Sequence, residues 1–476
     1  MQKRVISGIL ALALMLTLTL TLAQADVRVE LDGIDGGSAS VTASEDDSAA
    51  LLEGYLYQLN GLEAPETVVK AEGSGNTASR PATYMASMNP TLRAVYDQLV
   101  PEIEKIAAGE GSSSAFSLGI QMTFTKEELG IGGDMLVLGD DGQYHFSEET
   151  GAAIEKAVNE VMDMDMLLNQ LLAHHPYELY WFDKAFSGGA ISFQYNYGTD
   201  GQQTVTVGDF VVMMAVSQDY AVTDAATQQY YLYSPDTAKT GAASAAAATA
   251  AQVVAKNQGK GTYGKLVAYR EYITKAVDYN SDAAYTANYP YGDPWQLIYV
   301  FDENPDTNVV CEGYSKAFKY LCDLTWTGSD PEVACYLPTG TMDGGTGAGL
   351  HMWNIVSIGG ANYLADITNC DSGTTGAPDQ LFLCGAEGSV DASYAAATTN
   401  GTVTYVYDKE TLTLYDKELV LSATKYSPLA FDLNQLIALA RYAAGITTDK
   451  SAAIDVNKDG IISAADLTAM AQSLAS

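Results

Sequence analysis

The chain has 476 residues, of which 47% are hydrophobic, and a formal net charge of −35. This length suggests about three domains, and the apolar content excludes a chain that is disordered throughout. The acidic surface argues against nucleic-acid binding, because it would repel phosphate backbones.

The first 25 residues have the pattern of a secretory signal peptide. Lys3 and Arg4 give a basic start, an apolar stretch runs to about Leu22, and Ala23-Gln24-Ala25 is a small-x-small cleavage site. This pattern predicts a secreted, extracellular protein with no membrane attachment after cleavage, free or associated with a cell surface or scaffold. The alternative is a membrane anchor, since the apolar stretch approaches spanning length.

Two regions precede the cysteine-bearing part of the chain. Residues 26–85 are rich in Ser, Gly, Asp, Thr and Ala, and are expected to be loosely ordered. Residues 86–237 are predicted to form an α+β domain, whose role the sequence leaves open. Apolar periodicity predicts helices over Leu92–Ala107 and Glu148–Ala173, and strands over Tyr177–Phe182, Ala190–Tyr197 and Phe210–Val216.

Within this first domain, His174-His175 precedes Pro176 at an expected helix end. We interpret the pair as a C-terminal cap favoured by the helix dipole. Metal binding is the less favoured alternative, because adjacent residues on a helix face different ways.

Residues 238–426 form the next predicted domain, and this span contains all five cysteines. An odd number of cysteines in an exported protein indicates a free thiol. If that thiol is Cys311, the other four allow three disulfide pairings or none. The absence of a C-x-x-C pair argues against structural zinc. Helices are expected over 240–257 and Leu266–Ala276, and strands over Thr402–Tyr407, Thr411–Tyr415 and Lys417–Ser422.

The segment 309–321 combines a cysteine with a helical pattern. Cys311 is expected at the helix N-terminus, where unpaired N–H groups and the helix dipole stabilise a thiolate. The thiolate is the nucleophilic form of cysteine. The alternative is a cysteine that serves as a small buried hydrophobe. After Gly313, apolar residues recur at positions 0, 3, 4 and 7 of one helix face, namely Tyr314, Ala317, Phe318 and Leu321.

A predicted β-hairpin follows. Two strand-like runs, 351–358 and 361–368, flank Gly359-Gly360, which is the signal of a tight two-residue turn. Ile358 is then opposite Ala361, and the residue numbers of each opposed pair sum to 719.

In this register Trp353 faces Asp366 and His351 faces Thr368, so all four side chains lie on one face of the ribbon. Asp366 becomes the diagonal neighbour of His351, within reach of its imidazole. A slip of one residue in the turn would separate them. The alternative is that His351 is a structural residue.

Three motifs carry a resemblance to a known family. V-C-E-G-Y-S-K-A-F at 310–318, H-M-W-N-I-V at 351–356 and Y-L-A-D-I-T at 363–368 resemble the motifs of the bacterial transglutaminase-like superfamily. The order of cysteine, histidine and aspartate matches that family, and the gaps of 40 and 15 residues between them are typical of it. The resemblance covers about residues 240–425.

The resemblance implies a papain-like α+β fold. It also implies that Cys311 is the nucleophile, that His351 is a general base and then an acid, and that Asp366 fixes the histidine tautomer. Cys311 would attack an amide carbonyl, His351 would protonate the leaving amine, and a thioester would form. Water then gives hydrolysis and an amine gives crosslinking. The family includes peptidases, amidases and crosslinking enzymes, so membership leaves the reaction open.

An oxyanion needs donors beside the nucleophile. The backbone N–H of Cys311 is one expected donor, because it lies at the helix start. Upstream, Gln296 and Trp295 are candidates for the second donor, and packing is the alternative role for both. The glycine-rich segment 337–350 lacks the Gly-Lys-Ser/Thr ending of a phosphate loop, so we interpret it as a substrate-gating or plain connecting loop.

The last predicted module, residues 427–476, contains a twelve-residue calcium loop. Gly460 provides the sharp turn, and Asp466 closes the loop where bidentate Glu is usual. The loop resembles a dockerin repeat. Dockerins usually carry two repeats, but the first loop here would use Thr424, Tyr426 and Pro428, which cannot ligate calcium. The expected structural Ca²⁺ ligands are Asp455, Asn457, Asp459, Ile461 (through its carbonyl), Ser463 and Asp466.

The dockerin resemblance implies that a cohesin scaffold protein is a partner, and a calcium-stabilised tail without a partner is the alternative. For the whole chain, the leading hypothesis is a secreted cysteine peptidase or amidase acting on a protein or peptide substrate. A protein-crosslinking transglutaminase is the second hypothesis. A non-catalytic, scaffold-attached binding protein is the third. No cofactor is expected for catalysis.

Overall fold

The computed structural model describes residues 88–428, apart from 141, 186–188, 199–200, 224–229, 328–331, 346, 391–392 and 416–418. It also describes residues 41–42 and 69–70, and the positions 439, 442, 456, 462–463, 466 and 470. The predicted signal peptide and most of the segments 26–85 and 427–476 therefore lie outside the described residues. No helix within the described part is long and apolar enough to cross a membrane.

The protein has a mixed α+β fold, as predicted, and its described residues divide into two compact units. The first unit runs to Ser244 and includes Pro290–Gly292. The second contains Ala245–Tyr289 and the chain from Asp293 onward, so all five cysteines belong to it.

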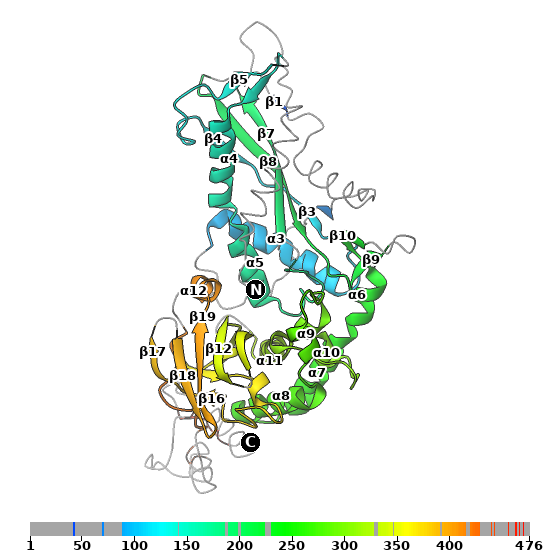
Figure 1. Ribbon diagram of the computed structural model, residues 1–476, viewed down its shortest axis with the longest axis vertical. Helices are drawn as coiled ribbons and strands as arrows, with labels where there is room; N and C mark the ends of the chain where they lie inside the picture. Colours follow the sequence, from blue (N-terminus) through cyan, green and yellow to red (C-terminus); the bar gives the residue numbers. More distant parts are fainter. Residues whose placement is uncertain are drawn as a thin grey trace. The chain divides into compact units, whose positions relative to one another are not determined.

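The first unit is built on a sheet with strand order β1-β7-β8-β3-β2, with β4 also paired to β8 (Figure 1). The antiparallel pair β7–β8 is its longest part, and its strands overlap the predicted strands at 190–197 and 210–216. The strands of this unit are β1 (Val41–Thr42), β2 (Val69–Lys70), β3 (Ala115–Leu118), β4 (Met122–Thr125), β5 (Leu136–Leu138), β6 (Tyr144–Phe146), β7 (Gly189–Gly198), β8 (Thr204–Met214), β9 (Ala221–Thr223) and β10 (Tyr230–Pro235).

The helices of the first unit begin at side-chain caps. Helix α3 (Pro90–Ala107), predicted from Leu92, starts where the Asn89 side chain accepts a hydrogen bond from Leu92 N at 2.8 Å. The predicted helix 148–173 is two helices, because Asp163 caps a new start by accepting from Met166 N at 2.9 Å. These two are α4 (Glu148–Val161) and α5 (Met164–His174), and α6 (Thr237–Ala243) follows later.

The predicted strand Tyr177–Phe182 is wrong. The segment forms turns, with Tyr180 N bonded to the carbonyl of Tyr177, and only Phe182 makes a β-bridge, to Val216. Tyr180, Trp181 and Phe182 are all buried, so the apolar run reflects burial on every side instead of a pleated strand.

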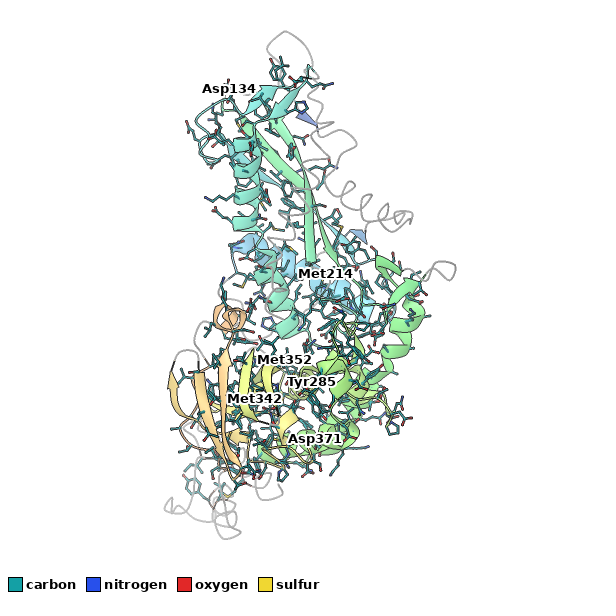
Figure 2. All side chains as sticks on the ribbon, viewed as in Figure 1. Asp134, Met214, Tyr285, Met342, Met352 and Asp371 are labelled. Carbon is teal, nitrogen blue, oxygen red and sulfur yellow. The ribbon has the colours of Figure 1, made fainter. Side chains whose placement is uncertain are left out.

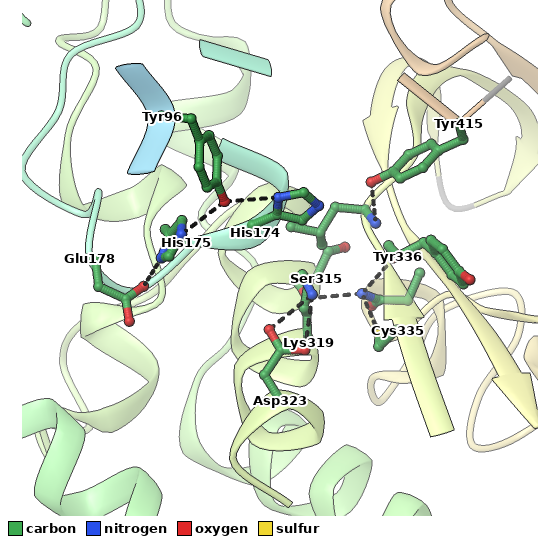
Figure 3. A network of polar contacts seen from close by, with 12 residues as sticks. Tyr96, His174, His175, Glu178, Ser315, Lys319, Asp323, Cys335, Tyr336 and Tyr415 are labelled. Carbon is green, nitrogen blue, oxygen red and sulfur yellow. Dashed lines mark hydrogen bonds and ion pairs between the residues drawn. The ribbon is translucent and has the colours of Figure 1, made fainter. Parts of the chain in front are cut away.

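The histidine pair marks the helix end, as predicted. His174 is the last residue of α5 and His175 is its C-cap. Both side chains point inward, to the hydroxyl of Tyr96, each with an N···O distance of 3.0 Å (Figure 3). Adjacent side chains can meet one partner because His175 leaves helical geometry, at φ −124° and ψ 54°.

The second unit packs a central helix between helices and strands. Helix α11 (Cys311–Thr325) contacts α7, α8 and α10 as well as strands β11, β13 and β14 (Figure 1). The predicted helices at 240–257 and 266–276 overlap α6 with α7, and α8, respectively. The other helices are α7 (Ala245–Asn257), α8 (Thr262–Ala276), α9 (Ser281–Tyr285), η2 (Asp293–Trp295), α10 (Ile298–Phe301), η3 (Thr368–Cys370) and α12 (Lys409–Tyr415).

Two antiparallel sheets complete this unit, with orders β11-β14-β15-β16 and β13-β12-β19-β18-β17. Strands β13 and β14 are separated only by Trp353, so the chain passes directly from one sheet into the other. The strands are β11 (Val333–Tyr336), β12 (Thr339–Gly345), β13 (Gly347–Met352), β14 (Asn354–Ile358), β15 (Ala361–Ala365), β16 (Phe382–Cys384), β17 (Glu387–Val390), β18 (Ser393–Thr398) and β19 (Gly401–Tyr407).

Three predictions about this unit need correction. The glycine-rich segment 337–350 is largely the paired strands β12 and β13, not a loop. The predicted strand 411–415 is helix α12, because Thr411 and Tyr415, one helical turn apart, are both buried on one face. Within the predicted strand 417–422, Leu421 makes one bridge, to Asn362, and residues 417–418 lie outside the described part.

Candidate active site

Cys311 is the first residue of α11, as the sequence predicted. Cys311 is partly exposed, whereas the other four cysteines are buried. Val310, the N-cap residue, makes no side-chain capping hydrogen bond. N–H groups at the start of the helix are therefore left for another acceptor. A Cβ on Gly313 would lie 2.5 Å from the Cβ of Val309, which explains the glycine two residues after the cysteine.

His351 lies on β13, opposite Gly340 of β12. Strand alternation directs its side chain inward, while the preceding Leu350 is 84% exposed. The ring of Trp353 stacks on the imidazole with centroids 5.9 Å apart and an interplanar angle of 18°. Met342 and Met352, labelled in Figure 2, lie on the same two paired strands. The imidazole is therefore held in a buried, largely apolar setting.

The predicted hairpin is right near its turn and wrong further away. Ile358 pairs with Ala361 and Asn354 with Ala365, in the expected register. Both turn glycines have positive φ, 58° and 79°, as a two-residue hairpin turn requires.

Beyond that point the ribbon separates. His351 belongs to the β12–β13 pair, Asp366 N bonds to the carbonyl of Leu381, and Thr368 begins η3. The predicted facing pairs, Trp353 with Asp366 and His351 with Thr368, are therefore wrong. The imidazole and the carboxylate nevertheless meet, because the two strands diverge around Trp353.

Asp366 is fully buried and has four hydrogen-bond donors. Its Oδ2 accepts from His351 Nε2 at 2.9 Å, and its Oδ1 accepts from the backbone N of Asn369 at 3.1 Å. Oδ2 also accepts from the Asn369 amide at 2.8 Å and from the Tyr405 hydroxyl at 2.7 Å. Burial alone would raise the pKa of Asp366, but the charge of His351 and these hydrogen bonds lower it overall. The group is a fixed carboxylate.

The third link is between His351 and Cys311, whose side chains interact closely enough for Cys311 to raise the pKa of the imidazole. Because Nε2 of His351 is directed at Asp366, we assign Nδ1 as the ring nitrogen that faces the thiol. Burial acts on His351 most strongly and lowers its pKa, but Asp366 and Cys311 together raise the pKa to about 10. The imidazole is therefore protonated at neutral pH.

No protein-family model matches this chain. No curated protein matches it either. The fold brings together the three predicted catalytic residues, Cys311, His351 and Asp366.

Two hydrogen bonds set the distance between α11 and the histidine strand. Ser315 Oγ, one turn after Cys311, donates to the carbonyl of Met352 at 2.9 Å. Asn354 Nδ2 donates back to the carbonyl of Ser315 at 3.0 Å. Both side chains are buried, and the two strand residues in these bonds, Met352 and Asn354, flank Trp353. They hold the nucleophile and the base in register.

The structure separates the two oxyanion candidates. Val310 N donates to the carbonyl of Pro294 at 2.8 Å, which places the segment of both candidates beside Cys311. The Trp295 ring contacts Tyr289, with centroids 5.7 Å apart. Gln296 is buried, and its Oε1 accepts from Lys316 Nζ at 2.7 Å. That bond fixes the orientation of the Gln296 amide.

Lys316 is itself buried and paired. Its Nζ lies 2.8 Å from Glu312 Oε1, one helical turn back, while it donates to Gln296. The sequence indicated a helix with one apolar face, but charged residues on the other face are buried as well. Lys316 is therefore a positioning group, because it holds the Gln296 side chain beside the nucleophile. Apolar periodicity in the sequence could not identify this role.

Tyr279 also belongs to this site and was missed. It bridges to Val309, two residues before Cys311. Burial, followed by the charges of Cys311, Tyr285 and Asp366, raises the pKa of its phenol. Tyr279 therefore stays neutral and can donate a hydrogen bond near the sulfur. Among the 31 tyrosines of the chain, nothing in the sequence distinguishes it.

The predicted calcium loop is described at few positions. The carboxylate of Asp466 is buried, and its two oxygens accept from Val456 N and Ser463 N, each at 2.7 Å. These bonds tie positions 2 and 9 of the loop to position 12, as a closed loop requires. Asp455, Asn457, Asp459 and Ile461 lie outside the described residues, and no cluster of three metal-ligating side chains occurs within them.

Proposed function

We propose that the second unit is a transglutaminase-like, papain-like domain that cleaves or transfers peptide or carboxamide groups through a thioester on Cys311. The observation that supports this best is the buried imidazole of His351, which bonds to Asp366 at 2.9 Å and interacts with Cys311 closely enough for Cys311 to raise its pKa. Nucleophile, base and orienting group follow one another in the site, which is the arrangement that activates a cysteine. The resemblance of the three motifs supports the same assignment.

The reaction would begin with the ion pair. The Cys311 thiolate attacks the carbonyl carbon of a protein or peptide substrate and gives a tetrahedral oxyanion. The backbone N–H of Cys311 and the Gln296 amide would donate to that oxygen. As the C–N bond breaks, the His351 imidazolium transfers its proton to the leaving amine. The products of this half are a thioester and a free amine.

The second half releases the enzyme. Neutral His351 takes a proton from water or from an incoming amine, which attacks the thioester carbonyl. The C–S bond breaks and the sulfur leaves as the thiolate, paired again with the imidazolium. Water yields an acid, and an amine yields a new amide. Mass spectrometry of a glutamine peptide with and without an alkylamine separates hydrolysis from crosslinking.

Selective alkylation of Cys311 tests the proposed ion pair. At pH 7 we expect iodoacetamide to modify Cys311 in the folded protein, because the imidazolium holds the sulfur as a thiolate and the site is accessible. His351→Ala should slow this labelling by at least about tenfold, since the proton acceptor is lost. The rate is measured by peptide mass spectrometry over time.

The buried thiols of Cys370 and Cys384 provide internal controls, because they should be labelled only after unfolding. Equal labelling rates in the native protein and in His351→Ala would contradict the ion pair and favour a binding protein without catalysis.

We also propose that residues 427–476 are a dockerin-like module that binds structural Ca²⁺ through one intact loop. The carboxylate of Asp466, which closes the loop through two backbone N–H groups, supports this. Asp455, Asn457, Asp459, the Ile461 carbonyl, Ser463 and Asp466 would hold the ion, and the signal pattern would place the module outside the cell. A cohesin scaffold protein is the proposed partner.

Calcium removal should therefore change the C-terminal module alone. Ca²⁺ should bind to the full chain with a dissociation constant between about 10⁻⁷ and 10⁻³ M, read by calorimetry. Asp459→Ala should abolish this heat, while Asp408→Ala, outside the loop, should leave it intact. A heat unchanged in Asp459→Ala would contradict the loop. Cohesin capture that persists in chelator would argue against calcium-dependent docking.

A further inference from the structure

The strand that carries His351 lies at an open edge of its sheet. In the order β13-β12-β19-β18-β17, β13 is the last strand, and within the described residues it pairs with β12 alone. Residues 347–350 of β13 are all exposed, and Leu350 is 84% exposed. Edges of this kind are usually blocked by a charged side chain or a proline. This stretch contains neither.

The helix that begins at Cys311 closes the edge at one end. The Ser315 hydroxyl donates to the carbonyl of Met352 at 2.9 Å, so this carbonyl points to α11 and away from β12. Cys311 lies one helical turn before Ser315, on the same side of the helix. The open part of the edge therefore ends at Leu350, two residues before the point where the helix of the nucleophile covers it.

The pairing with β12 determines which backbone groups face the open side. Trp353 N donates to the carbonyl of Pro338 at 3.2 Å, and these two residues continue the register of the β12–β13 pair. In an antiparallel pair, successive residues direct their backbone groups alternately toward the partner strand and away from it. Trp353 and His351 therefore face β12, whereas Met352 and Leu350 face away. The carbonyl of Met352, which is bonded to α11, agrees with this alternation.

The surroundings of the edge leave room for another chain. An added strand lies about 4.8 Å from its neighbour. A Cβ on Gly349 would meet no atom within 4 Å apart from its chain neighbours, so there is free space beside the strand. At the start of the stretch, a Cβ on Gly347 would lie 3.2 Å from the hydroxyl of Tyr285, which is 68% exposed (Figure 2).

We propose that this edge binds the substrate as an added β-strand. An extended stretch of polypeptide pairs with the backbone N–H and carbonyl of Leu350, and this pairing carries the reactive carbonyl to Cys311. The substrate class is therefore extended, flexible polypeptide, instead of isolated carboxamides. The inference rests on the proposed function, because it concerns how the same site receives its substrate.

Alkylation of Cys311 by peptide probes tests the edge without requiring turnover. One probe is an alanine tetrapeptide chloromethyl ketone, and the other places 6-diazo-5-oxo-norleucine, an electrophilic glutamine analogue, between two pairs of alanines. The faster of the two is compared with iodoacetamide, which needs no peptide site. The readout is the ratio of the two labelling rates, measured on the full mature chain by peptide mass spectrometry.

The variant Leu350→Pro removes the N–H that faces the open side and leaves the bonds of β13 to β12 in place. Loss of one backbone hydrogen bond should lower the ratio by about three- to tenfold. Leu350→Ala is the matched control, because it shortens the same side chain but keeps the N–H. Its ratio should exceed that of Leu350→Pro by the same factor. Equal ratios in Leu350→Pro and the native protein would overturn the proposal.

N-methylated probes test the same pairing from the substrate side, in the native protein, and so do not depend on how Leu350→Pro folds. With one backbone nitrogen of the probe methylated at a time, at least one position should slow labelling by about three- to tenfold. Equal rates for all methylated probes would contradict the added strand. A failure of the proposed catalysis would look different, because iodoacetamide would then label Cys311 equally fast in the native protein and in His351→Ala.

Discussion

Replacement of Cys311 by alanine is expected to lower amide hydrolysis or acyl transfer by at least about 10⁴-fold. The proposed thioester forms on this sulfur, and within the described residues no hydrogen bond joins His351 to another nucleophile. Activity is measured as amine or ammonia release from a panel of peptides, carboxamides and cell-wall fragments. Mass spectrometry of the wild-type enzyme after rapid acid quenching should find an acyl group on the peptide that contains Cys311.

A second cysteine variant separates loss of the nucleophile from a general effect of removing a thiol. Cys384 lies at the end of β16, buried, and outside the hydrogen bonds of the triad. Cys384→Ala should therefore retain activity close to that of the wild-type chain. Undiminished activity in Cys311→Ala would refute the proposed nucleophile, even if the triad geometry is correct.

Local sequence patterns were sufficient to predict two features of this site, the helix that begins at Cys311 and the hairpin between His351 and Asp366. The position of Cys311 at the start of a helix follows from apolar periodicity within eleven residues, and the hairpin register follows from a two-glycine turn. Both features depend on interactions between residues close in sequence. The contact between His351 and Asp366 was also predicted, although the pairing used to derive it fails beyond Asn354.

The supporting residues could not be predicted in the same way. Tyr405 reaches Asp366 from 39 residues downstream, on a strand whose alternation was visible but whose neighbours were not. Lys316 is buried only because helices and strands surround α11. The bond from Asn369 could have been predicted from the sequence, because an aspartate that accepts from the N–H three residues later is a common turn pattern.

Asp366→Asn is expected to reduce activity by about 10²–10⁴-fold and to change its dependence on pH. The carboxylate contributes to raising the pKa of His351 to about 10, against an ordinary value of 6.5. A histidine whose pKa is raised on folding gives stability that is complete below pH 6.5 and is lost as the pH rises through 10. The same protonation supports the ion pair, so wild-type activity should fall in that upper range.

Without the charge of Asp366, burial still lowers the pKa of His351, and mainly Cys311 is left to raise it. The upper limb of the pH profile, where activity falls at high pH, should therefore move down by about 1–3 pH units. Asp371→Asn is the matched control, because Asp371 is buried nearby but bonds to Tyr314. That variant should keep the upper limb of the wild-type profile. An upper limb that stays in place in Asp366→Asn would show that the carboxylate orients the imidazole without setting its charge, because orientation alone changes the rate equally at every pH.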